Sequence, residues 1–271
     1  MRKKAQQFGP WAIVTGANSG IGAAFAQRLA AQGYNLALVG RRSGAVEEAA
    51  QKIEQKYSVK TRSIITDLST DGFLEKISEA TKDLDIGLLI SNAGDDAMGA
   101  MLRVELDRLK QMLRLNTQSH LELAHYFGRR FEARGKGGIL LVSSTAGLQA
   151  TPFMVNYAGS KAYLLNLGMG LNYEMQKTGV NVTVLLPGPT KTPGLVDKPD
   201  IPLNTLPAPQ MKADTVAKIG MKALAKNKPY VIAGAVNRVM ARVGAFLGKT
   251  GGRNMWGSLM KPIVPKDLSI S

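Results

Sequence analysis

Seven short apolar runs recur along the chain and constrain its fold more than any other feature. They span residues 12–14, 36–39, 63–65, 88–90, 139–142, 182–186 and 230–232. Each run is continuous rather than alternating, which is typical of strands buried on both faces of a sheet. Segments with helical spacing lie between them, such as 23–31, 45–56 and 106–130. The alternation predicts an α/β fold, a doubly wound parallel seven-stranded sheet with helices on both faces.

The length of 271 residues suits one large α/β domain, and we predict a single domain over residues 1–271. The absence of cysteine excludes disulfides, thiolate nucleophiles and cysteine metal sites, and two histidines alone cannot complete a zinc site, so no metal is predicted. A mean hydropathy of −0.05 indicates a globular chain, and no apolar stretch reaches the length of a membrane-spanning helix. The N-terminal residues show no secretory segment, so we expect a cytoplasmic location.

A glycine-rich turn follows the first apolar run directly. It reads Thr-Gly-Ala-Asn-Ser-Gly-Ile-Gly and precedes an Ala-rich helix. Glycines there let the backbone approach a pyrophosphate, and the helix N-terminus offers unpaired N–H groups. We predict a dinucleotide phosphate site, with a plain turn as the alternative. Its residues are Gly16, Asn18, Ser19, Gly20, Ile21 and Gly22.

Arg41 and Arg42 follow the second apolar run, where an NAD site has an acidic residue for the ribose hydroxyls. Guanidinium groups pair with a 2′-phosphate instead, so NADP(H) is the predicted cofactor. The alternative is a pair of solvated surface arginines. After the third run, Asp67 and Leu68 could bind the adenine amino group, or Asp67 could cap a helix beginning near Thr70.

Tyr157 and Lys161 lie four residues apart at the start of a helical run, so their side chains share one face. A neighbouring ammonium favours the phenolate, which would move the tyrosine pKa from about 10 toward the range useful for proton transfer. Tyr157 is therefore a candidate general acid or base.

Six motifs occur together in one order: Thr15-Gly16-x-x-x-Gly20-x-Gly22, Asn92-Ala93-Gly94, Asn116, Ser144, Tyr157-x-x-x-Lys161 and Pro187-Gly188. Their order and spacing resemble the short-chain dehydrogenase/reductase family over residues 11–186. The resemblance implies a Rossmann fold and NADP(H)-dependent hydride transfer between the nicotinamide and a carbonyl or secondary alcohol.

The same resemblance implies roles for single residues. Tyr157 would be the proton donor, Lys161 would bind the nicotinamide ribose, and Ser144 would bind the substrate oxygen. Asn116 would anchor a relay water. Further cofactor contacts would come from Asn92, Ala93, Gly94, Pro187, Gly188, Thr190 and Thr192.

Three positions depart from the family pattern. Ser91 replaces the usual first Asn, Thr190 replaces an aliphatic residue, and Gly159 stands where alanine is commoner. The histidines His120 and His125 are interpreted as ordinary polar helix positions.

The partner is expected to be a small-molecule carbonyl compound or alcohol of apolar character, since Phe153, Met154, Met98 and Leu195 fall near the expected cleft. Two alternatives remain: an isomerase or dehydratase on the same fold, and a non-catalytic NADP(H)-binding sensor or interaction protein. Residues 187–225 are expected to form a substrate lid, because the prolines of 187–209 forbid a strand ladder. A linker is the other interpretation of that segment.

Residues 211–271 carry eleven basic and two acidic side chains, and residues 234–271 are interpreted as a basic C-terminal extension. An apolar stripe with helical spacing recurs within it: Val236, Val239, Met240, Val243, Phe246 and Leu247. This helix either packs over the substrate cleft, which we favour, or lies on an anionic membrane. No nucleic-acid motif accompanies the charge. A Leu-rich stretch at 164–171 fits a core or a homo-oligomer interface equally.

Overall fold

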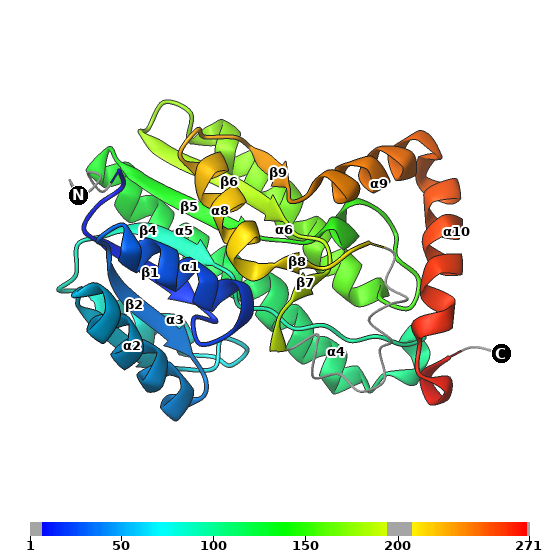
Figure 1. The fold of residues 1–271 in the computed structure, drawn as a ribbon, viewed down its shortest axis with the longest axis horizontal. Coiled ribbons are helices and arrows are strands. Elements are labelled where there is room, and N and C mark those ends of the chain that lie inside the picture. Colours follow the sequence, from blue (N-terminus) through cyan, green and yellow to red (C-terminus); the bar gives the residue numbers. More distant parts are fainter. Residues whose placement is uncertain (1–6, 194–207, 270–271) are drawn as a thin grey trace.

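The main sheet carries the seven predicted strands, all parallel (Figure 1). The computed structural model describes residues 7–193 and 208–269. The strands are β1 Trp11–Thr15, β2 Asn35–Gly40, β3 Thr61–Ile65, β4 Ile86–Ser91, β5 Gly137–Val142, β6 Val180–Leu186 and β9 Tyr230–Ile232. Their order is β3-β2-β1-β4-β5-β6-β9, so the predicted doubly wound fold is confirmed.

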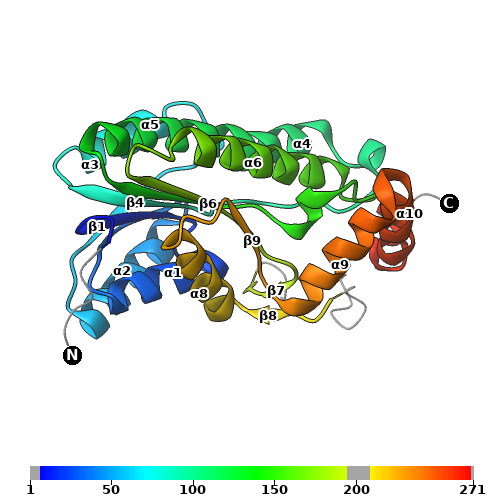
Figure 2. The ribbon, with the colours of Figure 1, turned by 90° about the horizontal axis from the view of Figure 1, so that it is seen from above.

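Helices cover both faces of the sheet (Figure 2). One face carries α1 Gly20–Ala31, α2 Ser43–Tyr57 and α8 Ala213–Leu224. The other carries α3 Phe73–Thr81, α4 Leu106–Leu113, α5 Ser119–Arg134 and α6 Val155–Glu174. β2 and β3 lie on one side of β1, whereas β4 and the strands that follow it lie on the other side. The strand order therefore switches between β1 and β4, and parallel α/β sheets bind ligands in the crevice at such a switch point.

Alternate residues of the central strands pack into two separate hydrophobic cores, one on each face of the sheet. Val14 packs in the cluster that contains Phe25 of α1, whereas Ile13 packs in the cluster that contains Phe127 of α5. All of these side chains are buried. Both faces of each central strand therefore need apolar residues, which explains why the runs in the sequence are continuous.

The predicted helix at 106–130 is interrupted by a π-helical turn, Arg114–Gln118, between α4 and α5. Two hydroxyls bond back to carbonyls one turn earlier: Thr117 Oγ1 to Leu113 O at 2.6 Å, and Ser119 Oγ to Leu115 O at 2.6 Å. These side chains compete with backbone N–H groups for the carbonyls. The extra residue of the π turn is therefore a local effect that hydrophobic spacing does not show.

The proline-rich segment contains a short ladder, so the prediction that its prolines forbid one is wrong. β7 Thr190–Lys191 pairs in parallel with β8 Met211–Lys212. Both residues of β7 lie between prolines and keep their own N–H groups. The Met211 N–H donates to the Pro189 carbonyl at 2.9 Å, which needs no N–H from proline. Residues 194–207, including Leu195, lie outside the described residues, and with them 14 of the 39 residues of the predicted lid 187–225.

Two further helices, α9 Ala235–Phe246 and α10 Gly248–Met260, lie beyond the end of the sheet (Figures 1 and 2). α9 approaches the loop after β5 closely, because a Cβ at Gly244 would lie 2.3 Å from Gln149 Oε1. At the end of α10, Met260 packs with Phe153, Ile263 and Val264. The C-terminal region thus joins the loops that follow β4 and β5. Across residues 7–193 and 208–269, no helix combines the length and apolarity needed to cross a membrane.

Candidate active site

The turn between β1 and α1 brings backbone atoms closer together than side chains would allow. A Cβ at Gly22 would lie 2.1 Å from the Gly16 carbonyl oxygen. Gly16 and Gly20 have φ of +64° and +55°, in the left-handed region that favours glycine. The cradle therefore requires glycine at these positions. The backbone of a cradle like this one, at the start of a helix, fits a pyrophosphate.

The ends of β1 and β4 are tied together beside this cradle. Thr15 Oγ1 accepts hydrogen bonds from the N–H groups of Asn92 at 2.8 Å and Ala93 at 2.9 Å. Asn92 Nδ2 donates to the Thr15 carbonyl at 3.0 Å. Thr192 reaches the same turn from the segment after β6, since its Cγ2 lies 3.0 Å from a Cβ built on Gly20. The structure thus gathers three separate predicted cofactor segments at one edge of the sheet.

Arg41 and Arg42 lie at the end of β2, where they line a second hollow with Thr66, Asp67 and Lys76. Both arginines are exposed. Burial works to raise the pKa of Asp67, but hydrogen bonds from Ser69 and the charge of Arg41 hold it below its ordinary value. Asp67 therefore stays ionised beside the arginines.

Asp67 does not cap a helix that begins near Thr70, because α3 begins at Phe73. Its carboxylate accepts hydrogen bonds from Ser69 N at 2.9 Å and Ser69 Oγ at 2.6 Å instead. Gly72, with φ of +80°, is the residue before α3 and interrupts any earlier helical path. Leu68 is buried beneath this loop.

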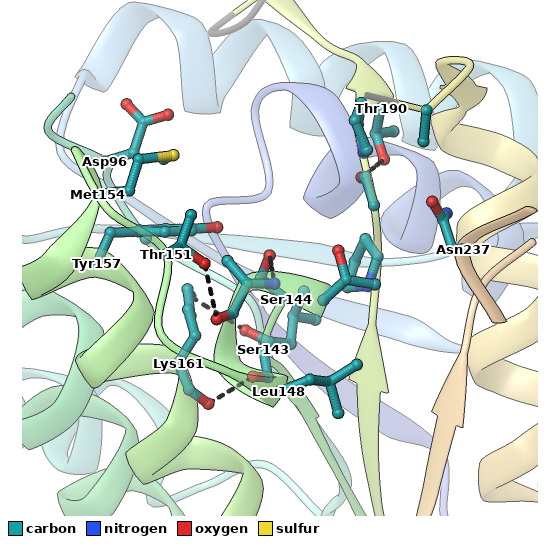
Figure 3. A pocket seen from close by; sticks show the side chains of 18 of the residues that line it. Asp96, Ser143, Ser144, Leu148, Thr151, Met154, Tyr157, Lys161, Thr190 and Asn237 are labelled. Atoms are coloured by element: carbon teal, nitrogen blue, oxygen red, sulfur yellow. Dashed lines mark hydrogen bonds between the residues drawn. The ribbon is translucent and has the colours of Figure 1, made fainter. Parts of the chain in front are cut away.

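Tyr157 and Lys161 project from the first turns of α6, and Ser144 follows β5 (Figure 3). Lys161 Nζ lies 5.7 Å from the centroid of the Tyr157 ring and donates to the Val142 carbonyl at 3.2 Å. The Lys161 backbone is held as well, since its carbonyl accepts a 2.7 Å hydrogen bond from Ser143 Oγ. The three predicted residues therefore converge on one hollow.

The electrostatics of this group differ from the expectation for Tyr157. Burial raises its pKa to about 12, opposed by a hydrogen bond with Ser144 and reinforced by the charge of Asp96. Burial also lowers the pKa of Lys161 to about 8, against the opposing effect of Asp96. The expected lowering of the tyrosine pKa is therefore wrong for the protein alone. Desolvation of the phenolate outweighs the neighbouring ammonium.

Asn116 lies in the π-helical turn and is buried. Its Oδ1 accepts from Asp95 N at 2.9 Å, and its Nδ2 donates to the Asp95 carbonyl at 2.8 Å and to Ser160 Oγ at 3.1 Å. Gly94 passes close by, because a Cβ there would lie 3.2 Å from both Asn116 Oδ1 and Lys161 Nζ. Asn116 thus fixes the chain after β4 against α6, next to Lys161.

His120 is not an ordinary polar helix position. It is buried, and its ring nitrogens bridge two groups at the end of β4: Nδ1 to Ser91 Oγ at 2.7 Å, and Nε2 to the Ala93 carbonyl at 2.9 Å. Ser91 is one of the three positions that depart from the family pattern. His120 follows Asn116 by four residues, and this spacing was the available signal for it. His125, in contrast, is exposed, as interpreted from the sequence.

The segment after β6 forms the opposite wall of the hollow. Thr190 Oγ1 donates to the Gly188 carbonyl at 2.9 Å. Gly188 also packs on α9, since a Cβ there would lie 2.4 Å from the Asn237 side chain. Pro187 and Thr192 line the same wall.

A cavity of about 400 Å³ joins these elements. Its lining is largely apolar away from Tyr157, with Met98, Leu148, Met154, Met240, Trp256 and Met260. Met98 and Met154 were predicted near the cleft, whereas Phe153 is buried in the cluster with Met260. Sequence reasoning missed Asp96, Gln149, Asn237 and Trp256, which also line the cavity.

Only part of the predicted apolar stripe of α9 faces this cavity. Met240 lines it together with Asn237 and Ala241. The other members are exposed: Val236, Val239, Val243, Phe246 and Leu247. The helix packs at the cleft as we favoured, through Asn237, Met240 and Ala241, and it approaches Gln149 closely at Gly244.

A parallel sheet with a glycine cradle, and a Ser, Tyr and Lys cluster at the same edge, define a class of nucleotide-binding oxidoreductases. The short chain dehydrogenase family model matches residues 10–200, and the chain belongs to this family. A 7β-hydroxysteroid dehydrogenase of Clostridium sardiniense is 37% identical over 234 residues, which cover 86% of this chain and 88% of that protein.

Two solved structures support the same assignment. One, described in work on the stereoselectivity of 7β-hydroxysteroid dehydrogenase, has a TM-score of 0.84 at 26% identity and covers 93% of this chain and 98% of its own. A short-chain dehydrogenase from Sphingobium yanoikuyae in complex with NADPH has a TM-score of 0.79 at 30% identity, with 88% and 94% covered. The chain is therefore an oxidoreductase of this family.

Proposed function

We propose that the protein is an NADP(H)-dependent oxidoreductase that interconverts a bulky apolar ketone and its secondary alcohol. The observation that carries the proposal is the convergence of Ser144, Tyr157 and Lys161 on one largely apolar cavity. NADPH, when bound, supplies the hydride. The glycine cradle, Asn92 to Gly94 and the segment from Pro187 to Thr192 are the residues that would hold it.

We assign the role of proton donor to the hydroxyl of Tyr157. A pKa of about 12 keeps its hydroxyl protonated at neutral pH, which suits a group that donates to a developing alkoxide. Ser144 offers a hydroxyl beside it to hold the substrate oxygen. Lys161 places a positive charge below the phenol ring, which stabilises the phenolate once the proton has left. Asn116 holds the chain after β4 against α6, the helix that carries Lys161.

The substrate class follows from the shape and lining of the cavity. Methionines at 98, 154, 240 and 260 and Trp256 present flexible and flat apolar surfaces that suit a large hydrocarbon frame. A relative and a structural neighbour are both described as 7β-hydroxysteroid dehydrogenases, which supports a polycyclic alcohol or ketone as the type of substrate.

The first test replaces Tyr157 by Phe. This change removes only the hydroxyl, so NADPH should still bind while kcat with a polycyclic ketone falls by a factor on the order of 10² or more. Tyr163→Phe is the matched control, because Tyr163 lies on the exposed side of the same helix. If Tyr157→Phe kept most of the kcat, another residue would have to be the proton donor.

The second test concerns the cofactor. Arg41 and Arg42 can pair with a 2′-phosphate, and a charge-assisted hydrogen bond contributes roughly 1.5–3 kcal/mol, so NADPH should bind roughly tenfold or more tightly than NADH. Titration of the Arg41→Ala, Arg42→Ala variant should show that preference lost. Lys218→Ala, Lys222→Ala, which removes two exposed charges from α8, should keep it. Equal affinities in the unmodified protein would contradict the assignment to NADP.

The alternatives kept from the sequence give different results in these assays. A sensor binds NADPH without turnover of any ketone. An isomerase or dehydratase converts its ligand with no net consumption of NADPH. Neither predicts a loss of NADPH oxidation that is specific to Tyr157→Phe.

A further inference from the structure

The outer side of α9 combines exposed apolar and basic side chains. Val236, Val239, Val243 and Phe246 recur at helical spacing, and Phe246 is 91% exposed and Val239 55% exposed. Arg238 and Arg242 are exposed on the adjoining side of the same helix. An exposed apolar stripe beside a basic flank is unusual on a helix that already packs through its other side.

The charge around this stripe has one sign. Residues 235–266 contain six basic and no acidic residues. On α10 and just after it, Lys249, Arg253 and Lys261 are exposed as well. The region therefore attracts anions, and its own sequence supplies no carboxylate to neutralise it.

We propose that the α9 face, defined as Val236, Val239, Val243, Phe246, Arg238 and Arg242, docks on an anionic lipid bilayer. Such a surface offers both kinds of contact that this face requires: acyl chains for the valines and Phe246, and charged head groups for the arginines. Figures 1 and 2 show that α9 and α10 lie at one end of the molecule, beyond the end of the sheet.

A bilayer satisfies this face better than a second copy of the chain or a nucleic acid does. Two copies that met through α9 would bring four arginines together with no acid from either helix to pair with them. A nucleic acid would match the arginines and leave Phe246 in water. The docking proposal does not rest on the proposed reaction, since it uses only the outer side of α9.

The test is flotation of the full-length protein with vesicles. We expect it to float with phosphatidylcholine vesicles that contain phosphatidylglycerol and not with phosphatidylcholine vesicles, and we expect high salt to weaken the association. Each basic residue at such a surface contributes on the order of a few-fold in affinity, so Arg238→Glu, Arg242→Glu should reduce the bound fraction roughly tenfold or more. Phe246→Ser should reduce it several-fold.

Two matched controls separate this face from the overall charge of the protein. Lys218→Glu, Lys222→Glu makes the same charge reversal at the same spacing on α8, and Tyr173→Ser removes an aromatic ring that is 75% exposed on α6. Both should float as the unmodified protein does. All substituted side chains are exposed, and unchanged thermal unfolding and NADPH binding would show that each variant is folded.

Three outcomes would overturn the proposal. The first is equal flotation with neutral and anionic vesicles, or with neither. The second is an equal loss in the α8 control, which would mean that net charge alone binds. The third is a Phe246→Ser variant that changes the sedimenting mass of the protein without changing flotation, which would assign the face to contact between copies.

Discussion

His120 shows how one buried side chain can organise the floor of the site. Its two hydrogen bonds hold the Ser91 hydroxyl and the Ala93 carbonyl, which lie on either side of Asn92. The ring must carry a proton on Nε2 to donate to a carbonyl, so Nδ1 accepts from Ser91. Burial, followed by the charge of Lys161, lowers the pKa of His120 to about 3 despite its bond to Ala93. The imidazole is therefore neutral in the folded protein at pH values well above 3.

This neutral histidine makes the stability depend on pH. The unfolded chain protonates His120 near its ordinary pKa of 6.5, whereas the folded protein resists protonation down to about 3. Between these values the unfolded state binds one more proton, so the free energy of unfolding falls as the pH is lowered. One proton corresponds to about 1.4 kcal/mol per pH unit, or roughly 2 kcal/mol between pH 7 and pH 5.

Denaturant unfolding at both pH values measures this effect. His120→Gln cannot take up a proton in this range, so its stability should fall less between pH 7 and pH 5 than that of the unmodified protein. His125→Gln removes the exposed histidine of the same helix and should keep the original dependence. If the two variants behaved alike, the acid sensitivity would have to come from carboxylates.

At the scale of an element, α6 carries catalytic candidates and two glycines with opposite surroundings. Gly159 is exposed and a Cβ there would meet nothing within 4 Å, whereas a Cβ at Gly168 would lie 2.3 Å from Val184 Cγ2 of β6. The helix thus gains nothing from the first glycine and needs the second to approach the sheet.

Alanine substitutions should therefore have opposite signs within this helix. Gly159→Ala should stabilise the protein by about 0.5–1 kcal/mol, because alanine has the higher helix propensity. Gly168→Ala should destabilise it, by roughly 1–3 kcal/mol, because the sheet must move or the valine must change rotamer. Thermal unfolding measures both. Loss of stability in Gly159→Ala would show that the N-terminal part of α6 requires backbone freedom near Tyr157.

At the scale of the whole molecule, the sheet was predictable because a strand that is buried on both faces has a continuous run of apolar residues. Continuous apolar runs such as 88–90 and 139–142 need no knowledge of distant residues. The gathering of the candidate cofactor residues was predictable for a related reason: they follow strand ends, and parallel strands bring their carboxyl ends to one edge.

The features that sequence reasoning missed depend on contacts between distant segments. The bond from His120 to Ser91 joins residues 29 apart, and neither residue alone indicates it. The raised pKa of Tyr157 depends on burial and on the charge of Asp96, opposed by a hydrogen bond with Ser144, and none of these contacts lies at helical spacing from the tyrosine. The outward direction of the apolar stripe on α9 depends on how closely Gly244 approaches Gln149, which periodicity cannot reveal.

The cavity walls and the glycine cradle come from different stretches of chain. Met240, Trp256 and Met260 belong to α9 and α10, whereas Gly16, Gly20 and Gly22 belong to the turn after β1. The hydrogen bonds beside that turn join Thr15 to Asn92 and Ala93. Substitutions at sites that share no partners tend to act additively. Substitutions in the last two helices can therefore reshape the cavity walls while the glycine cradle keeps its own contacts, which makes the C-terminal region the natural place to redirect the protein toward another substrate.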